Sequence, residues 1–252
     1  MKEKNRSKIR RVLPRVALAL VTTLVAAFAL ATAAGCAPRD HAAAVADTLG
    51  KIEWYGVSSM RIEANGKVVY IDPYRFKDGE KADIILITHL HKDHFDYGKV
   101  KALSKPGTVV VAPYPLGIGN RVLKSGKGAT IQGVRIEAIA AYEPQSKAYH
   151  LKLEGNAGYV ITFGGVRIYN AGPTDFVPEV ESVRSDIAIL SDDTARKSGE
   201  SAKIAISCGA SVLIPIDHSL ISREAPALDA FRAALGSSSA LIAVPALHAP
   251  AD

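Results

Sequence analysis

Residues 88–96 read Thr-His-Leu-His-Lys-Asp-His-Phe-Asp, and this stretch determines how the rest of the chain is interpreted. Three of the seven histidines of the protein, His89, His91 and His94, fall within it, with Asp93 among them. It directly follows a continuous apolar run, which is typical of a buried strand. His89 and His91 are two residues apart, so in extended backbone their imidazoles face the same side. Imidazole and carboxylate groups bind Zn²⁺, and also Mn²⁺ or Fe, so the stretch predicts a metal site without fixing the metal.

The pattern of apolar runs predicts mostly strands before the middle of the chain and alternating strands and helices after it. The predicted strands are 51–55, 60–63, 68–71, 82–87, 109–111, 132–139, 158–163, 166–169, 187–190, 212–215 and 241–244. The predicted helices are 118–124, 200–208 and 223–235. This order indicates an α/β fold with buried sheets, but does not by itself separate a sandwich from a doubly wound sheet.

The His-x-His-x-Asp-His pattern of residues 89–94 resembles the signature of the metallo-β-lactamase superfamily. Residues 53–56 (Glu-Trp-Tyr-Gly), 69–73 (Val-Tyr-Ile-Asp-Pro) and 165–172 (Gly-Val-Arg-Ile-Tyr-Asn-Ala-Gly) are similar to its lactonase-like branch, which contains the ascorbate-6-phosphate-lactonase-like proteins. The resemblance covers residues 51–218. It implies a four-layer αββα sandwich with a site for one or two metal ions at its rim.

The resemblance also implies roles for the residues of the histidine stretch. In that superfamily the positions of His89 and His91 hold one metal ion, and those of Asp93 and His94 hold a second. The aspartate also orients the attacking water, so Asp93 is the candidate catalytic residue. The implied cofactor is one or two zinc ions, with Mn²⁺ or Fe as alternatives, and the implied substrate is a small molecule. The implied reaction is hydrolysis of an ester, lactone or phosphodiester by metal-activated hydroxide.

Three other positions depart from the superfamily pattern. The superfamily usually has Ala-Gly-Asp-Thr, in which the aspartate bridges two metal ions. Residues 171–174 of this chain are Ala-Gly-Pro-Thr, so Pro173 stands at the aspartate position. Asp175 could replace it as a ligand, or could cap a helix that begins near residue 177. The nearest replacement for a mid-chain histidine ligand is His150. The last ligand position is Asp217, followed by His218; either could bind metal, because a one-residue slip in a strand reverses the side chain.

Four further carboxylates could bind the metal or support its ligands. Asp72 and Asp96 match acidic positions that support the metal ligands in the superfamily, although Asp72 could equally stabilise the turn at Pro73. Asp192 and Asp193 could bind metal or be solvated.

Two functions therefore remain open: a metal-dependent hydrolase, and a non-catalytic descendant that keeps the fold and a partial site for an envelope ligand. A β-lactamase acting on antibiotics is a third, less favoured by the resemblance to the lactonase-like branch.

The net charge of +6 arises entirely from residues 1–35, which carry seven Lys or Arg and one Glu. The neutral remainder gives no electrostatic support for binding nucleic acid, and we expect no such partner. Residues 2–15 are basic and residues 16–34 are apolar and uncharged, as in a bacterial secretory signal. The following Gly-Cys, ending at Cys36, resembles the lipobox of bacterial lipoproteins, in which the cysteine is lipidated.

A retained membrane-spanning helix and an ordinary cleaved signal are the alternatives for this leader. Each of the three places the body of the protein outside the cytoplasm, in the cell envelope. We expect a signal peptide over residues 1–35, a tether over 36–50 and a metallo-β-lactamase-like domain over 51–252. With Cys36 lipidated, Cys208 is left as a buried thiol, and neither a disulfide nor a zinc site made of cysteines is expected.

Overall fold

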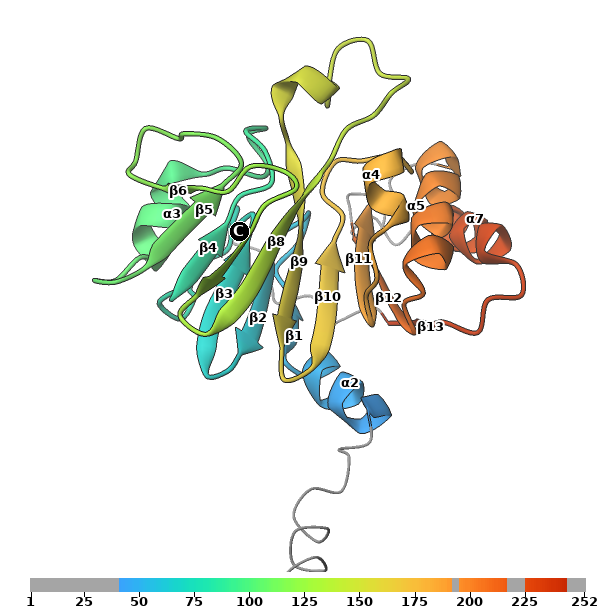
Figure 1. Ribbon diagram of the computed structural model, residues 1–252, viewed down its shortest axis with the longest axis horizontal. Helices are drawn as coiled ribbons and strands as arrows, with labels where there is room; N and C mark the ends of the chain where they lie inside the picture. The colour runs from blue at the N-terminus through green and yellow to red at the C-terminus, as the bar shows by residue number, and fades with distance from the viewer. Residues whose placement is uncertain (1–40, 192–194, 217–224, 244–252) are drawn as a thin grey trace, which may run out of the picture. The chain divides into compact units, whose positions relative to one another are not determined.

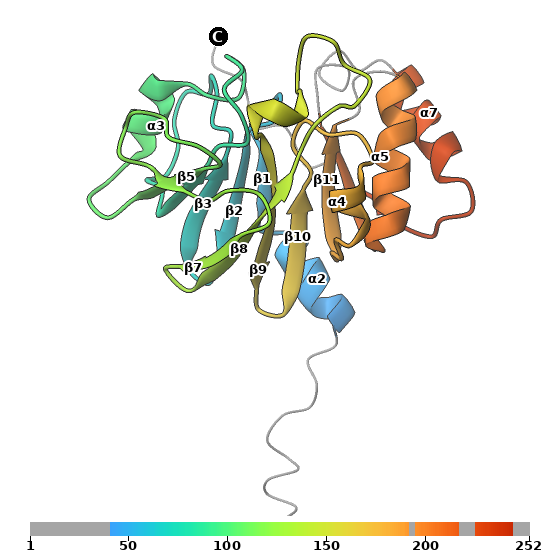
Figure 2. The ribbon, with the colours of Figure 1, turned by 45° about the horizontal axis from the view of Figure 1, so that its top comes forward.

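The computed structural model describes residues 41–191, 195–216 and 225–243. Within these ranges the strands form a six-stranded and a seven-stranded sheet (Figure 1). The two sheets pack face to face, and one apolar cluster contains side chains of both, among them Ile62 and Val69 of the first and Ile136 and Ile168 of the second. Figure 2 shows the same two layers with helices on their outer sides.

The first sheet has the strand order β1-β2-β3-β4-β5-β6. Its strands are β1 (Ile52–Trp54), β2 (Met60–Ala64), β3 (Lys67–Ile71), β4 (Ile84–Leu86), β5 (Val109–Ala112) and β6 (Arg121–Val122). Strands β2 and β3 form a hairpin, in which Asn65 and Gly66 have φ of 52° and 68° as a tight two-residue turn requires. From β3 to β6 the strands are parallel, and β4 is buried along its whole length.

The second sheet has the order β13-β12-β11-β10-β9-β8-β7. Its strands are β7 (Gly128–Ile131), β8 (Val134–Ala140), β9 (Ala157–Phe163), β10 (Val166–Asn170), β11 (Ile187–Ser191), β12 (Val212–Ile216) and β13 (Leu241–Ile242). Strands β7 to β10 are antiparallel, and β10 to β13 are parallel. The carboxyl ends of the parallel strands therefore share one edge, where loops gather.

Helices cover the outer face of each sheet. Helix α3 (Tyr97–Leu103) packs Val100 and Leu103 against the first sheet. Helices α4 (Pro178–Glu181), α5 (Ala195–Cys208) and α7 (Ala225–Leu235) pack against the second sheet through residues such as Val180 and Phe231. A single 3₁₀ turn, η1 (Lys152–Glu154), lies in the loop between β8 and β9. The αββα sandwich predicted from the sequence is confirmed.

The structure corrects two local predictions. Residues 41–49 of the predicted tether form helix α2 (His41–Leu49), which buries Val45 and Thr48, so the folded body begins before Lys51. Three consecutive alanines explain this, because alanine has the highest helix propensity. The predicted helix at 118–124 is wrong: β6 lies there instead, and Gly119 has a φ of 73°, which interrupts a helix.

Three further observations concern the leader and the cysteines. No helix in the described ranges is both long and apolar enough to cross a bilayer. The apolar residues 16–34 and Cys36 lie outside those ranges, so the lipoprotein prediction stays a prediction. Cys208 is buried with a free thiol, as expected, and its Sγ donates to the carbonyl of Ala205.

Candidate metal centre

The histidine stretch begins two residues after the carboxyl end of β4. The backbone N–H of Ala157, at the start of β9, donates to the carbonyl of Thr88. The hydroxyl of Tyr159 on β9 donates to the carbonyl of Ile87 over 2.8 Å. Both bonds connect the second sheet to the loop of the first, so the loop is held between the two layers.

His89, His91 and His150 form a compact group. One ligand atom from each lies within 4.8 Å of the other two. His150 Nε2 lies 3.1 Å from His91 Nδ1, and the His89 and His150 ring centroids are 5.1 Å apart. The loop that carries His150 closes on itself, because the N–H of Glu143 donates to the His150 carbonyl. The structure thus places His150, predicted as the replacement for a missing ligand, beside the two histidines of the stretch.

A hydrogen-bonded relay fixes the orientation of His89. Thr88 Oγ1 lies 2.6 Å from Asp72 Oδ2 and 2.8 Å from His89 Nδ1. A carboxylate only accepts hydrogen bonds, so the Thr88 hydroxyl donates to Asp72 and accepts from the Nδ1–H of His89. The lone pair is then on His89 Nε2, a buried atom with no hydrogen-bond partner among the described residues. An unpartnered imidazole nitrogen held in this way is suited to bind a metal ion.

Electrostatics keep the His89 imidazole neutral. Burial, followed by the neighbouring His94, His150 and His91, lowers the pKa of His89 far below its ordinary value. Burial and the adjacent His150 and His94 also lower the pKa of His91. Neutral imidazole is the form that binds metal ions, so the cluster is prepared for a cation.

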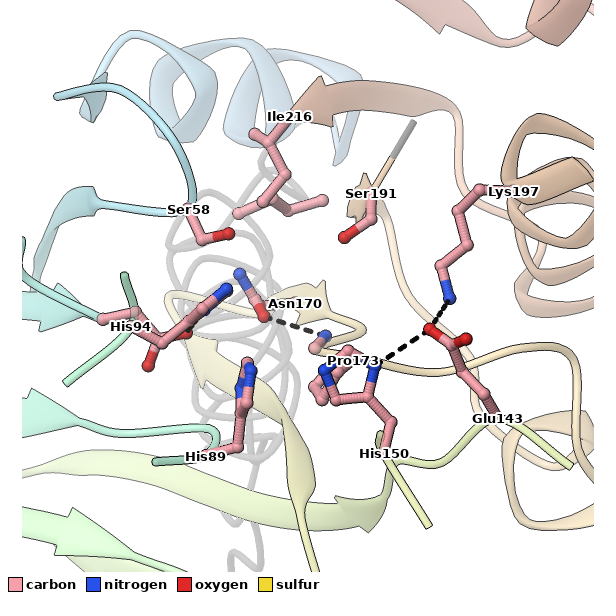
Figure 3. Close-up of a pocket in the computed structure, with 13 residues that line it drawn as sticks. Ser58, His89, His94, Glu143, His150, Asn170, Pro173, Ser191, Lys197 and Ile216 are labelled. Atoms are coloured by element: carbon pink, nitrogen blue, oxygen red, sulfur yellow. Dashed lines mark hydrogen bonds and ion pairs between the residues drawn. The ribbon is translucent and has the colours of Figure 1, made fainter. Parts of the chain in front are cut away.

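Glu143 holds His150 in the same manner, and Lys197 holds Glu143. His150 Nδ1 and Lys197 Nζ each lie 3.0 Å from Glu143 Oε1 (Figure 3). Burial alone would raise the pKa of Glu143, but its bonds to His150 and Lys197 lower it to about 2. The carboxylate is therefore ionised and accepts from His150 Nδ1–H, which leaves the Nε2 lone pair facing His91.

A second group with metal-ligating atoms in mutual reach consists of Asp72, His89 and His94. Asp72 Oδ2 already accepts from Thr88 Oγ1 and lies 2.9 Å from His94 Nδ1, while Oδ1 accepts from the Thr88 N–H. Asp72 is 1% exposed. Its carboxylate is thus engaged in holding His89 and His94, which supports the first of the two roles predicted for it. The group of three imidazoles is the better candidate for the ion.

The remaining sequence candidates occupy different surroundings. Asp93 lies at the rim, 36% exposed, with Oδ2 3.9 Å from His94 Nε2, and belongs to neither group. Asp96 does not support the ligands as predicted: it caps α3 by accepting from the Lys99 N–H, a role that its place before a helix favours. The predicted ligands Asp217 and His218, and the carboxylates Asp192 and Asp193, lie outside the described residues.

Asp175 fills neither of its two predicted roles in the described structure. The N-cap of α4 is Val177, which makes no side-chain capping bond. Asp175 is buried, and its Oδ1 lies 3.3 Å from Lys197 Nζ. It belongs to neither group of potential metal ligands. An ion pair with a buried lysine therefore accounts for this carboxylate.

Lys197, which the sequence analysis did not single out, is 4% exposed and is the centre of a buried charge network. Besides Glu143 and Asp175, its Nζ donates to the carbonyl of Thr174 over 2.7 Å. A lysine in the first turn of a polar helix carries no sequence signal for such a role. Glu143 likewise lies outside every motif that the sequence analysis used.

Two cavities adjoin His89. An enclosed one of about 60 Å³ is lined, among others, by His94, Glu143, His150, Asn170, Pro173 and Lys197 (Figure 3). An open groove of about 480 Å³ lies beside His91. Its other lining residues are Leu90, Tyr114, Glu154 and Asn156. The exposed ring of Tyr149 stands next to His91, with centroids 5.7 Å apart.

Comparison with known proteins gives a match of residues 51–189 to the beta-lactamase superfamily domain. A UPF0173 protein of Pyrococcus abyssi is 33% identical over 152 residues, which are 56% of this chain and 68% of that protein. A UPF0173 metal-dependent hydrolase of a Geobacillus species is 27% identical over 193 residues, covering 67% of this chain and 85% of the relative.

A similar fold is found in the crystal structure of a candidate metal-dependent hydrolase from Parabacteroides distasonis. The two chains are 29% identical with a TM-score of 0.68. The likeness covers 78% of this chain and 93% of the other. It therefore extends beyond the histidine stretch to most of both sheets.

Proposed function

Because this chain belongs to the metallo-β-lactamase superfamily, we propose that it hydrolyses a small-molecule ester or lactone at a metal ion held by His89, His91 and His150. The observation that carries the proposal is the buried Nε2 of His89, which has no hydrogen-bond partner among the described residues and lies beside the imidazoles of His91 and His150. The lactonase-like similarity of residues 165–172 supports the substrate class. Zinc suits this donor set, with Mn²⁺ or Fe as alternatives.

A divalent ion in this group would supply Lewis-acid activation of a water molecule and of the scissile carbonyl. The chain's own residues prepare for it from two sides. Asp72 and Thr88 fix the His89 imidazole, and Glu143 with Lys197 fixes His150. Asp93, at the exposed rim, is the proposed residue that orients the attacking water and accepts its proton.

The charge around the two cavities favours an uncharged substrate over a phosphodiester. The groove beside His91 is lined by Glu154 and, among the described residues, by no lysine or arginine. In the enclosed cavity the ammonium of Lys197 is already bonded to Glu143 and Asp175. A phosphodiester carries a negative charge, and sites for such groups supply positively charged or paired donors. The apolar Leu90 at the groove suits an acyl or lactone ring instead.

Metal analysis and hydrolysis of two model substrates test the proposal on the full-length protein. We expect one metal ion per chain, hydrolysis of p-nitrophenyl acetate, and little hydrolysis of bis(p-nitrophenyl) phosphate. His89→Ala removes the buried ligand and should abolish both metal binding and hydrolysis. His41→Ala is the matched control, because His41 lies on α2 and pairs with Asp186 at the surface. Unchanged hydrolysis by His89→Ala contradicts the proposal.

A non-catalytic, metal-binding descendant is the second candidate, and Pro173 is the observation that favours it. Pro173 lines the enclosed cavity where the superfamily pattern has a bridging carboxylate. Such a protein would bind metal as above but hydrolyse neither model substrate. The same pair of measurements therefore separates the two functions.

We also propose that the protein is a lipoprotein of the bacterial cell envelope, attached to the membrane through Cys36. The supporting pattern is a basic segment, an uncharged apolar run and small residues ending at a cysteine. On this proposal the metal centre acts on substrates outside the cytoplasm.

A further inference from the structure

Asn170 is a buried amide at the end of β10 that the proposed mechanism does not yet use. It pairs in register with Tyr159 on β9 and with Ile189 on β11, so its backbone is fixed from both sides. The residue is 2% exposed. Its side chain lines the enclosed cavity next to His89 and points into it (Figure 3).

One hydrogen bond sets which end of the Asn170 amide faces the cavity. The N–H of Gly172 donates to Asn170 Oδ1 over 3.1 Å. The reversed amide would place its NH₂ group against this N–H, and two donors would then face each other. Asn170 Nδ2 therefore points away from Gly172. This buried nitrogen has no hydrogen-bond partner among the described residues.

Two buried nitrogens that have no hydrogen-bond partner within the described part of the chain thus border a single cavity. His89 Nε2 presents a lone pair and Asn170 Nδ2 presents N–H donors. Leaving a buried donor unpaired is unfavourable, so such groups in native proteins usually serve a ligand, ion or water. The cavity of about 60 Å³ accommodates a water molecule or a small anion, but not the body of a substrate. The open groove, which His89 also lines, is the place for the body of the substrate.

We propose that Asn170 is a catalytic residue whose Nδ2 donates a hydrogen bond to the negatively charged oxygen that forms in this cavity during hydrolysis. The inference rests on the proposed function, because the ion held by His89 would bring that oxygen into reach. A fixed donor aimed at developing charge stabilises it without reorganisation, and this effect is strongest where water is excluded. The Gly172 bond provides the fixed orientation, and the burial of Asn170 keeps its Nδ2 away from bulk solvent.

Binding of a small anion tests this without relying on turnover. The full-length protein is loaded with Co²⁺, the metal content is measured, and azide is titrated while the cobalt absorption spectrum is followed. Asn170→Leu has nearly the same shape but no donor, and should weaken azide binding about 10- to 100-fold, the effect of losing a hydrogen bond to a charged group. Asn65→Asp, at an exposed hairpin turn whose φ of 52° aspartate tolerates, is the control for the asparagine substitutions and should bind azide as the wild type does.

A second variant covers the case in which Asn170→Leu does not fold. Asn170→Asp keeps the oxygen that accepts from Gly172 but replaces the NH₂ donor by an acceptor, so it should bind azide even more weakly. Azide affinity within about twofold of wild type in a folded, cobalt-loaded variant overturns the inference alone. Failure of the wild type to bind metal overturns the proposed function, and the inference with it. Where p-nitrophenyl acetate is hydrolysed, Asn170→Leu should lower kcat with little change in KM.

Discussion

Replacing Thr88 with valine removes one hydroxyl from the centre of the relay that orients His89. The hydroxyl donates to Asp72 Oδ2 over 2.6 Å and accepts from His89 Nδ1 over 2.8 Å. Thr88 is fully buried, and valine has nearly the same shape. The substitution therefore deletes two hydrogen bonds while leaving the packing almost unchanged, which makes it a sharp test of the relay.

The expected loss follows from the groups left behind. A hydrogen bond to a charged group contributes about 1.5–3 kcal/mol, and a buried donor left unpaired costs about 1–3 kcal/mol. The two effects overlap, because both concern the same hydroxyl, so we expect about 3 kcal/mol less free energy of unfolding in the metal-free protein. The His89 ring also loses its orienting partner. Substitutions of groups that orient metal-binding histidines typically weaken metal affinity about 10- to 100-fold.

The assay is urea unfolding of the chelator-treated protein, followed by metal titration in competition with a chromophoric chelator. Thr162→Val is the matched control. Thr162 lies on β9, and its buried hydroxyl has no hydrogen-bond partner among the described residues. Removing an unsatisfied hydroxyl should leave stability unchanged or raise it slightly. If the two variants differ by less than about 0.5 kcal/mol, and Thr88→Val binds metal as the wild type does, the relay is not what orients His89.

Three further predictions concern other parts of the molecule. Glu143→Gln weakens the hold on His150 and should lower metal affinity about tenfold in the same chelator competition, with exposed Glu63→Gln unchanged. For Asp83, burial opposes ionisation, but the Val68 N–H and Lys105 outweigh it and lower the pKa. The carboxylate therefore stabilises the fold above about pH 4, and Asp83→Asn should be less stable than wild type at pH 7, with the difference vanishing as the pH falls below that value. Cys36→Ala should move the protein from the membrane to the soluble fraction of expressing bacteria, as judged by fractionation.

The αββα sandwich and half of the metal centre could be predicted because the sequence patterns that indicate them are local. Strands such as β4 and β12 are buried on both faces and read as continuous apolar runs. The histidine stretch gathers its ligands within a few residues of one such strand. The same logic failed at residues 118–124, where apolar spacing suggested a helix and the positive φ of Gly119 prevents one. It also missed α2, because residues 41–49 show no strand pattern and were interpreted as a tether, although their alanines favour a helix.

The other half of the centre is assembled from distant segments, and no local pattern shows which residues meet. Asp72 and Asp96 both matched acidic positions of the superfamily, yet Asp72 faces His94 and Asp96 caps a helix. The difference depends on the path of the loop around His94 rather than on residue type. Lys197 reaches the site from α5, and its contacts with Glu143 and Asp175 place its ammonium group there.

The buried ammonium group of Lys197 affects how many metal ions the centre can hold. In the superfamily pattern a carboxylate at the position of Pro173 lies between two divalent ions and offsets their repulsion. Here Pro173 contributes no charge, and Glu143 and Asp175 are both paired with the buried ammonium of Lys197. A second divalent ion on this side of the site would have to displace Lys197 from those carboxylates, and breaking a buried ion pair is strongly unfavourable. The positive charge of Lys197 therefore already neutralises the carboxylates that a second metal ion would need. For this reason we expect the three imidazoles to hold a single metal ion.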